Sequence, residues 1–277
     1  MTTTKIFSVL IFTSFIFISC DKKLPQHVEN EINQEKAEVF TKEVTYDHEG
    51  TSYKSFAAFP ADSMESKPVI FIIPEWWGLN EYAKDRANQL AEMGYFTLAL
   101  DFYGNGKVAD NLEEAKKLSS PFYENPALAK KAFDAAKEKL SDFPNADKSK
   151  IVVIGYCFGG AHALNIARQD AELKGAVSFH GSLMTGVKPT HNSVPVLVLN
   201  GEADEFVPQE EIEAFKTEMD SAQIKYKFVN YPGAMHAFTN PAADEAAEKY
   251  GLKVAYNKEA DLKSWEELKV FLTEVFE

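Results

Sequence analysis

Short apolar runs recur along the chain and alternate with longer stretches in which apolar residues repeat at helical spacing. Continuous runs such as residues 69–73 are typical of strands buried on both faces of a sheet. The pattern predicts strands at residues 44–46, 53–59, 69–73, 95–100, 151–154, 176–179, 196–200 and 225–230. It predicts helices at residues 81–93, 111–119, 126–140, 208–221 and 261–275, and one more directly after the glycines at 159–160.

Strands that alternate with helices indicate an α/β fold with a mostly parallel sheet covered by helices on both faces. The first two strands flank a turn at residues 48–50 and are expected to form an antiparallel edge. Residues 43–277 contain no internal repeat and no linker, so we predict one domain there. A hydrophobic content of 45% in 277 residues is ample for its core.

The net charge of −13 argues against a nucleic-acid partner, because phosphate binding requires a basic surface. An acidic surface mainly favours solubility and identifies no substrate.

The first residues have the features of a targeting segment. Lys5 precedes an apolar run at residues 6–18 that is broken only by three hydroxyl side chains, and Ser19 and Cys20 follow it. Because a membrane-spanning helix needs about 20 apolar residues, this run fits the central region of a signal peptide better.

A small residue directly before Cys20 resembles the lipobox of bacterial lipoproteins, although Phe17 stands where leucine is commoner. The resemblance implies a signal peptide at residues 1–19, a lipid on Cys20, a flexible polar tether at 20–42 and a location in the bacterial cell envelope, anchored to a membrane without spanning it. An ordinary secretory peptide or an uncleaved anchor would also fit the run. Since lipidation would account for Cys20, no disulfide is expected.

Residues 151–164 combine a β-branched run, a glycine-flanked turn and a helical segment. This is the layout of a nucleophile elbow, with Cys157 at the position of the nucleophile between Gly155 and Gly159. The turn would hold the Cys157 sulfur at the N-terminus of a helix, where the helix dipole favours a thiolate. The alternative is that Cys157 is a small buried residue at the end of a core strand.

Two further residues follow strand ends in the order that a catalytic triad needs. Asp204 lies after the strand at 196–200, and His236 lies after the next one. A cysteine nucleophile needs a base to remove its proton and a carboxylate to orient that base. Singly, Asp204 could cap the helix that begins near Pro208, and His236 could be a solvated loop residue.

The remaining histidines are weaker candidates. We expect His162 to pack or cap on the elbow helix, and the others lack a strand-to-loop setting; they are His27, His48, His180 and His191. No cluster of histidine, cysteine and carboxylate has metal-ligand spacing, so no metal is predicted.

The loop after the strand at 69–73 carries Glu75, Trp76 and Trp77. A carboxylate among aromatic side chains has a raised pKa, which suits proton transfer, although Glu75 could also be a surface residue. We expect an oxyanion hole formed by the backbone N–H groups of Phe158 and Trp76. The two tryptophans could wall a pocket or could be ordinary core residues.

These motifs together resemble the dienelactone hydrolase family of α/β-hydrolases over residues 43–277. The resemblance rests on the segments 155–160, 74–78 and 233–238, and on Asp204 followed by Val207 and Pro208. It implies a Cys-His-Asp triad that cleaves esters and lactones through an acyl-enzyme, without a cofactor. It also implies that Glu75 approaches the cysteine and takes part in switching the thiol to a thiolate when substrate arrives.

The chain departs from the family where two arginines hold a substrate carboxylate. Asn105 and Asn240 stand at these positions, with Lys107 as a possible substitute for the first. Since an amide cannot replace a bidentate guanidinium, we do not expect an anionic dienelactone as substrate. The predicted substrate contacts are Trp77, Tyr103, Asn105 and Phe238.

The hypothesis from the sequence is a lipid-anchored cysteine hydrolase that cleaves a small carboxylic ester, lactone or thioester. The alternative is a non-catalytic envelope lipoprotein that uses the hydrolase fold as a binding module. A weaker alternative keeps the enzyme but changes the reaction, to C–C hydrolysis or acyl transfer.

Overall fold

The computed structural model of the chain describes residues 38–61, 65–183, 186–190 and 193–277. The predicted signal peptide, Cys20 and nearly all of the predicted tether lie outside the described residues.

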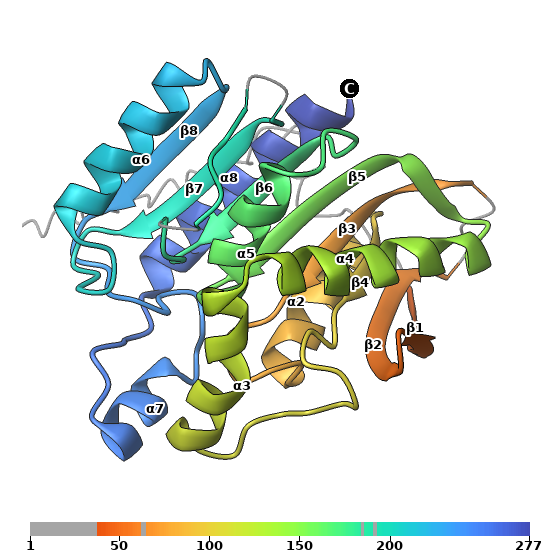
Figure 1. Cartoon of the computed structure of the whole chain (residues 1–277), viewed down its shortest axis with the longest axis horizontal. Coiled ribbons are helices and arrows are strands. Elements are labelled where there is room, and N and C mark those ends of the chain that lie inside the picture. The colour runs from red at the N-terminus through yellow and green to blue at the C-terminus, as the bar shows by residue number, and fades with distance from the viewer. Residues whose placement is uncertain (1–37, 62–64, 184–185, 191–192) are drawn as a thin grey trace, which may run out of the picture. The chain divides into compact units, whose positions relative to one another are not determined.

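The core of the fold is an eight-stranded sheet in the order β1-β2-β4-β3-β5-β6-β7-β8 (Figure 1). Its strands are β1 (Val39–His48), β2 (Thr51–Pro60), β3 (Lys67–Ile73), β4 (Phe96–Ala99), β5 (Ala146–Tyr156), β6 (Gly175–Phe179), β7 (Val196–Gly201) and β8 (Tyr226–Tyr231). Strand β2 runs antiparallel to both of its neighbours, β1 and β4. The other pairs, from β4 across the sheet to β8, are all parallel. The predicted α/β fold with a mostly parallel sheet is therefore confirmed.

The helices of the described residues include all of the predicted ones. They are α2 (Glu81–Glu92), α3 (Leu112–Glu124), α4 (Ala127–Lys139), the 3₁₀ turn η1 (Leu140–Asp142), α5 (Phe158–Ala167), α6 (Gln209–Ser221), α7 (Ala243–Tyr250) and α8 (Lys258–Phe276). Helix α7 was not predicted, because it has only eight residues and buries only Ala243, so few apolar positions mark it in the sequence.

Helix α3 continues past its predicted end at Ser119 and includes Pro121. A proline inside a helix removes a backbone hydrogen bond. Packing compensates for this loss, because the Phe122 ring lies 5.2 Å from that of Phe102 and 5.8 Å from that of Phe158.

Strand β3, in the parallel region, buries side chains on both faces. In β3, Val69, Phe71 and Ile73 belong to the core cluster that includes residues of α4, α5 and α6. Ile70 and Ile72 belong to the cluster that includes residues of α2 and α8. Two buried faces explain why the sequence shows a continuous apolar run here rather than an alternating one.

The first strand begins before the predicted domain boundary at Glu43. Val39 pairs with Pro60 and Phe40 with Phe59 in the antiparallel ladder, and the two phenylalanine rings lie 5.3 Å apart. Residues 39–42 therefore lie in the sheet and not in the tether, because cross-strand pairs such as Phe40 with Phe59 hold them there.

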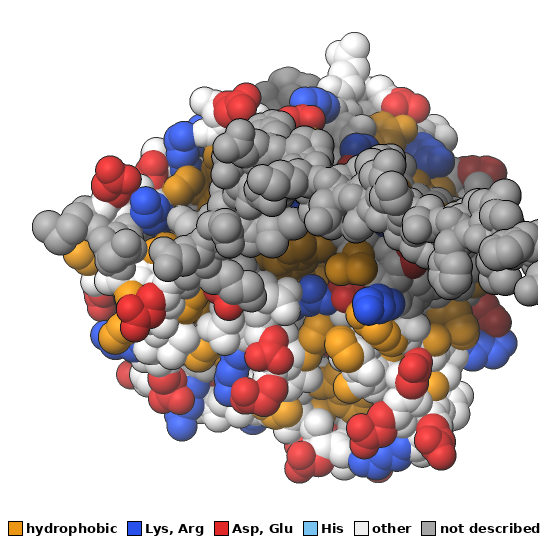
Figure 2. Space-filling view, turned by 180° about the vertical axis from the view of Figure 1, so that it is seen from behind, with side chains coloured by type: hydrophobic (Ala, Val, Ile, Leu, Met, Phe, Trp, Pro, Cys, Tyr) orange, Lys and Arg blue, Asp and Glu red, His pale blue; other side chains and the backbone are white. Residues whose placement is uncertain are grey.

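No helix among the described residues combines the length and the apolar character needed to cross a bilayer. On the rear face, the part of the described surface that is visible carries acidic and basic side chains interspersed with one another (Figure 2).

His162 is buried in α5 among aromatic rings. Its ring packs against that of Phe158 at 4.4 Å and contacts the rings of Phe102, Phe122 and Tyr123. Neither ring nitrogen has a partner in the described part of the chain. Burial lowers the pKa of His162 from 6.5 to about 3.

We expect His162 to make the protein less stable in acid. Between the unfolded pKa of 6.5 and the folded pKa of about 3, the unfolded state holds an extra proton, so the free energy of unfolding falls as the pH falls through this window. At pH 5 the loss from this group is about 2 kcal/mol. Urea unfolding of the wild type and of His162→Leu at pH 7.5 and pH 5 would measure it. The variant should lose less stability than the wild type, whereas an equal loss in both proteins would contradict this account.

Candidate active site

Cys157 occupies a sharp turn between β5 and α5. Its φ is +54°, which is unusual for a residue with a side chain. A Cβ atom on Gly155 would lie 2.0 Å from the carbonyl oxygen of Gly159, and one on Gly159 would lie 2.1 Å from that of Ile73. Both positions therefore require glycine, and the turn presents Cys157 at the carboxyl edge of the sheet.

Asp204 and His236 meet beyond the ends of β7 and β8. The His236 Nδ1 atom lies 2.8 Å from the Asp204 Oδ2 atom, and both residues are buried. The Phe206 ring contacts the His236 ring at 5.0 Å. A carboxylate on Nδ1 leaves Nε2 as the nitrogen that can exchange a proton with a nucleophile.

The imidazole of His236 has an unusual affinity for protons. Burial by itself would lower the pKa of His236, but the charge of Cys157 and hydrogen bonds to Asp204 and Cys157 raise the pKa well above its usual value. This arrangement favours the imidazolium form of His236.

Glu75 is only 4% exposed and accepts a hydrogen bond from Asn240 Nδ2 at 2.7 Å. The Asn240 side-chain oxygen in turn accepts the backbone N–H of Ala242 at 2.9 Å. Burial raises the pKa of Glu75, and the hydrogen bond from Asn240 and the charges of His236 and Arg86 offset only part of this effect. The carboxyl group therefore holds a proton more readily than an exposed glutamate, which suits it to proton exchange.

A cavity of about 690 Å³ brings these groups together. Glu75, Cys157, His236 and Asn240 all line it, as do Trp76 and Trp77. Its far wall comes from α3 and α7, through residues that include Lys116, Ser119, Tyr123, Ala243, Ala246 and Lys249. Three of the four predicted catalytic residues thus line one cavity, and the fourth, Asp204, is joined to it through its hydrogen bond to His236. Their assigned roles stay predictions.

The predicted substrate contacts separate into two groups. Trp77 lines the cavity. The described residues that line it do not include Tyr103, Asn105 or Phe238. The Tyr103 hydroxyl donates to the Trp76 carbonyl oxygen at 2.9 Å, which supports the loop from behind. Asn105 has a φ of +59° and donates its N–H to Ser52, and Phe238 is fully buried in the core.

The backbone N–H groups of Phe158 and Trp76 are the predicted oxyanion donors, and this role stays a prediction. Phe158 is the first residue of α5, so its backbone N–H is one of the helix donors without an intrahelical acceptor. Trp76 lines the cavity next to Glu75.

His180 was wrongly set aside as lacking a strand-to-loop setting. It directly follows β6, is fully buried, and its Nδ1 accepts the backbone N–H of Cys157 at 3.1 Å. Its position after an apolar strand was the available signal, because every parallel strand of this sheet ends at the same edge. Burial, the charge of His236 and that of Arg86 hold the pKa of His180 well below its usual value.

Within the described ranges, no group of three histidine, cysteine or carboxylate side chains is arranged to hold a metal ion.

Comparison with known proteins identifies a family. The model of the dienelactone hydrolase family matches residues 54–276. A relative from Aquifex pyrophilus, named "Protein usf", is 29% identical over 228 residues, which cover 78% of this chain and 97% of the relative.

Solved structures agree with this match. A dienelactone hydrolase-like promiscuous phosphotriesterase from metagenomic libraries superimposes with a TM-score of 0.78 and 29% sequence identity, covering 86% of this chain and 98% of the other. A structure named "m3DLH" gives a TM-score of 0.77 and 30% identity over the same shares of the two chains.

Proposed function

The chain belongs to the dienelactone hydrolase family and is a hydrolase that acts on ester bonds, and we propose that Cys157, His236 and Asp204 carry out its reaction through an acyl-enzyme. The observation that carries the proposal is the 2.8 Å hydrogen bond between His236 and Asp204, with His236 and Cys157 lining the same cavity.

In the proposed reaction, the Cys157 sulfur attacks the ester carbonyl carbon and forms a tetrahedral intermediate. The N–H groups of Phe158 and Trp76 would stabilise the negative charge on its oxygen. The carbon–oxygen bond to the leaving alcohol then breaks, and the His236 imidazolium gives that alcohol its proton. Water, deprotonated by His236, attacks the resulting thioester and releases the carboxylic acid and the thiolate.

We assign Glu75 the exchange of a proton with the thiol when substrate enters. Its burial, its raised pKa and its place in the same cavity as Cys157 support this assignment. A binding module would need neither a proton-exchanging carboxyl group nor a buried imidazole that holds a proton, and these features favour the enzyme over that alternative.

The substrate that the cavity favours is a neutral ester or lactone with an apolar group. Asn240 donates one N–H to Glu75 and accepts the N–H of Ala242, so its amide cannot give a substrate carboxylate the charged bidentate contact of a guanidinium. Two lysines of the cavity wall, Lys116 and Lys249, could attract an anionic substrate. The acidic side chains of Asp110 and Glu245 also line the cavity and balance the positive charge of these lysines. A volume of about 690 Å³ falls within the range of about 300–1,000 Å³ that is typical of ligand pockets.

We expect the protein to hydrolyse neutral nitrophenyl esters and to accept acyl groups larger than acetyl. Because Ala246 in α7 lines the cavity, Ala246→Trp should lower kcat/KM for nitrophenyl octanoate about tenfold or more and change that for nitrophenyl acetate little. The matched control is Glu248→Trp, which puts the same indole on an exposed position of α7. No turnover of any ester by the wild type would contradict the proposed function. An equal effect of Ala246→Trp on both esters would contradict the account of the cavity.

We further propose that a lipid on Cys20 anchors the domain to a bacterial membrane. The support is the apolar run at residues 6–18 and the small residue before Cys20, which lie outside the described residues. The mass of the mature protein tests the proposal, since an N-terminal residue other than a lipidated cysteine would exclude it.

A further inference from the structure

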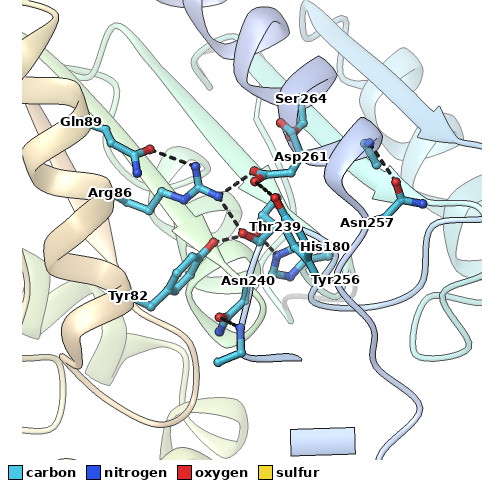
Figure 3. Close-up of polar contacts among 12 residues, drawn as sticks. Tyr82, Arg86, Gln89, His180, Thr239, Asn240, Tyr256, Asn257, Asp261 and Ser264 are labelled. Carbon is cyan, nitrogen blue, oxygen red and sulfur yellow. Dashed lines mark hydrogen bonds and ion pairs between the residues drawn. The ribbon is translucent and has the colours of Figure 1, made fainter. Parts of the chain in front are cut away.

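His180 lies between the two halves of the active site. Its Nδ1 accepts the backbone N–H of Cys157 at 3.1 Å, and the Phe179 carbonyl oxygen accepts the same N–H at 2.9 Å. Its Nε2 lies 2.8 Å from the Thr239 hydroxyl oxygen (Figure 3). Its ring makes T-shaped contacts with the rings of His236 and Phe238, with centroids 5.2 Å apart in each pair. One fully buried side chain therefore contacts both the nucleophile turn and the loop that carries His236.

The hydrogen bonds determine which tautomer His180 adopts. A backbone N–H can only donate, so Nδ1 of His180 must be the unprotonated nitrogen. The ring proton then lies on Nε2 and is donated to Thr239 Oγ1. A neutral His180 is compatible with the imidazolium that the proposed reaction needs at His236, because two charged rings in contact would repel each other.

Thr239 is held in turn by the helices on one face of the sheet. Its hydroxyl lies 2.6 Å from the Tyr82 hydroxyl of α2, and its carbonyl oxygen accepts Arg86 Nη2 at 2.6 Å. Arg86 also donates to Asp261 of α8 at 2.6 Å. Figure 3 shows that the Arg86 guanidinium bonds to both Thr239 and Asp261. The position of Thr239 is thus set by elements that lie far apart in the sequence.

The residues joined by this link need support from their surroundings. Cys157, His180 and Ala237 have φ values of +54°, +41° and +58°, and such conformations persist only where neighbouring contacts hold them. The loop from His236 to Asn240 also carries the amide that binds Glu75. A shift of Thr239 would therefore move both the base and the residue that orients Glu75.

We propose that His180 and Thr239 are positioning residues, which hold the Cys157 turn and the His236 loop at the separation that the reaction requires. This inference rests on the proposed function. Neither residue touches the reacting atoms, so both act through geometry, to which reaction rates are sensitive at the scale of about 1 Å.

The test is Thr239→Val, which removes the hydroxyl and keeps the shape of the side chain. We expect kcat for nitrophenyl acetate to fall about tenfold or more while KM stays within about twofold, because the substrate cavity is intact. Thr239→Ser keeps the hydroxyl and should restore most of the rate. Thr97→Val is the matched control: Thr97 is also fully buried, and its hydroxyl donates to the carbonyl oxygens of Ala58 and Ala87, away from the site.

A double-mutant cycle with His180→Phe completes the test. If both residues serve one link, His180→Phe/Thr239→Val should be no slower than the slower single variant. Wild-type kcat in Thr239→Val, equal losses in Thr239→Ser and Thr239→Val, an equal loss in Thr97→Val, or additive losses in the double variant would each overturn the inference. An inactive wild type would instead refute the proposed function.

Discussion

Replacing Cys157 by alanine is expected to lower kcat for nitrophenyl esters by about 10⁴-fold or more. Alanine has no atom that can attack the carbonyl carbon, so the acyl-enzyme cannot form. The backbone at this position has a φ of +54°, and alanine is no more strained there than cysteine because both carry a Cβ atom. The variant should therefore fold with a near-normal melting temperature. Activity retained by a carefully purified Cys157→Ala protein would exclude Cys157 as the nucleophile.

Cys157→Ser serves as the intermediate case. A hydroxyl at an elbow is a workable nucleophile, but it ionises much less readily than a thiol, so we expect residual turnover well below that of the wild type. The chain contains two cysteines, so Cys157 is the single thiol in a Cys20→Ser background. There, alkylation by iodoacetamide should proceed in step with the loss of activity.

Asp204→Asn is expected to lower kcat by about 10³- to 10⁴-fold at pH 7, by analogy with the effect of this change in serine triads. An amide can present its NH₂ to Nδ1 of His236, which would put the ring proton on the wrong nitrogen. The expected loss lies in kcat rather than in KM, because Asp204 is not among the described residues that line the cavity.

The pH profile offers a second measure of the same substitution. Hydrogen bonding and the charge of Asp204 help to raise the pKa of His236, so their removal lowers the pH at which the imidazolium loses its proton. The alkaline limb of kcat/KM should therefore move to lower pH in Asp204→Asn.

Asp101→Asn is a suitable control for this variant. Asp101 is also a buried carboxylate beyond a strand end, where it accepts backbone N–H groups of Lys54, Gly104 and Gly106. Its replacement should lower the melting temperature and leave the alkaline limb in place. The same displacement of the limb in both variants, or none in Asp204→Asn, would contradict the role assigned to Asp204.

Most of the fold could be predicted from the sequence because its signals are local. Buried strands appear as continuous apolar runs, and the elbow appears as glycines that flank Cys157. The positions of Asp204 and His236 at the edge of the sheet could also be predicted from the sequence. Since neighbouring parallel strands end at one edge of the sheet, residues that follow those strands converge there whatever the details of packing.

What the sequence alone determined, then, was the sheet and the set of chemical groups at its edge. Only the tertiary structure decided how these groups are held. Asn240 binds Glu75 across 165 positions of the chain, and Arg86 binds Asp261 across 175. Helix α7, with only eight residues, was recognisable only as a wall of the cavity. Such contacts depend on the direction in which side chains point after the sheet has formed, and no local pattern in the sequence records that direction.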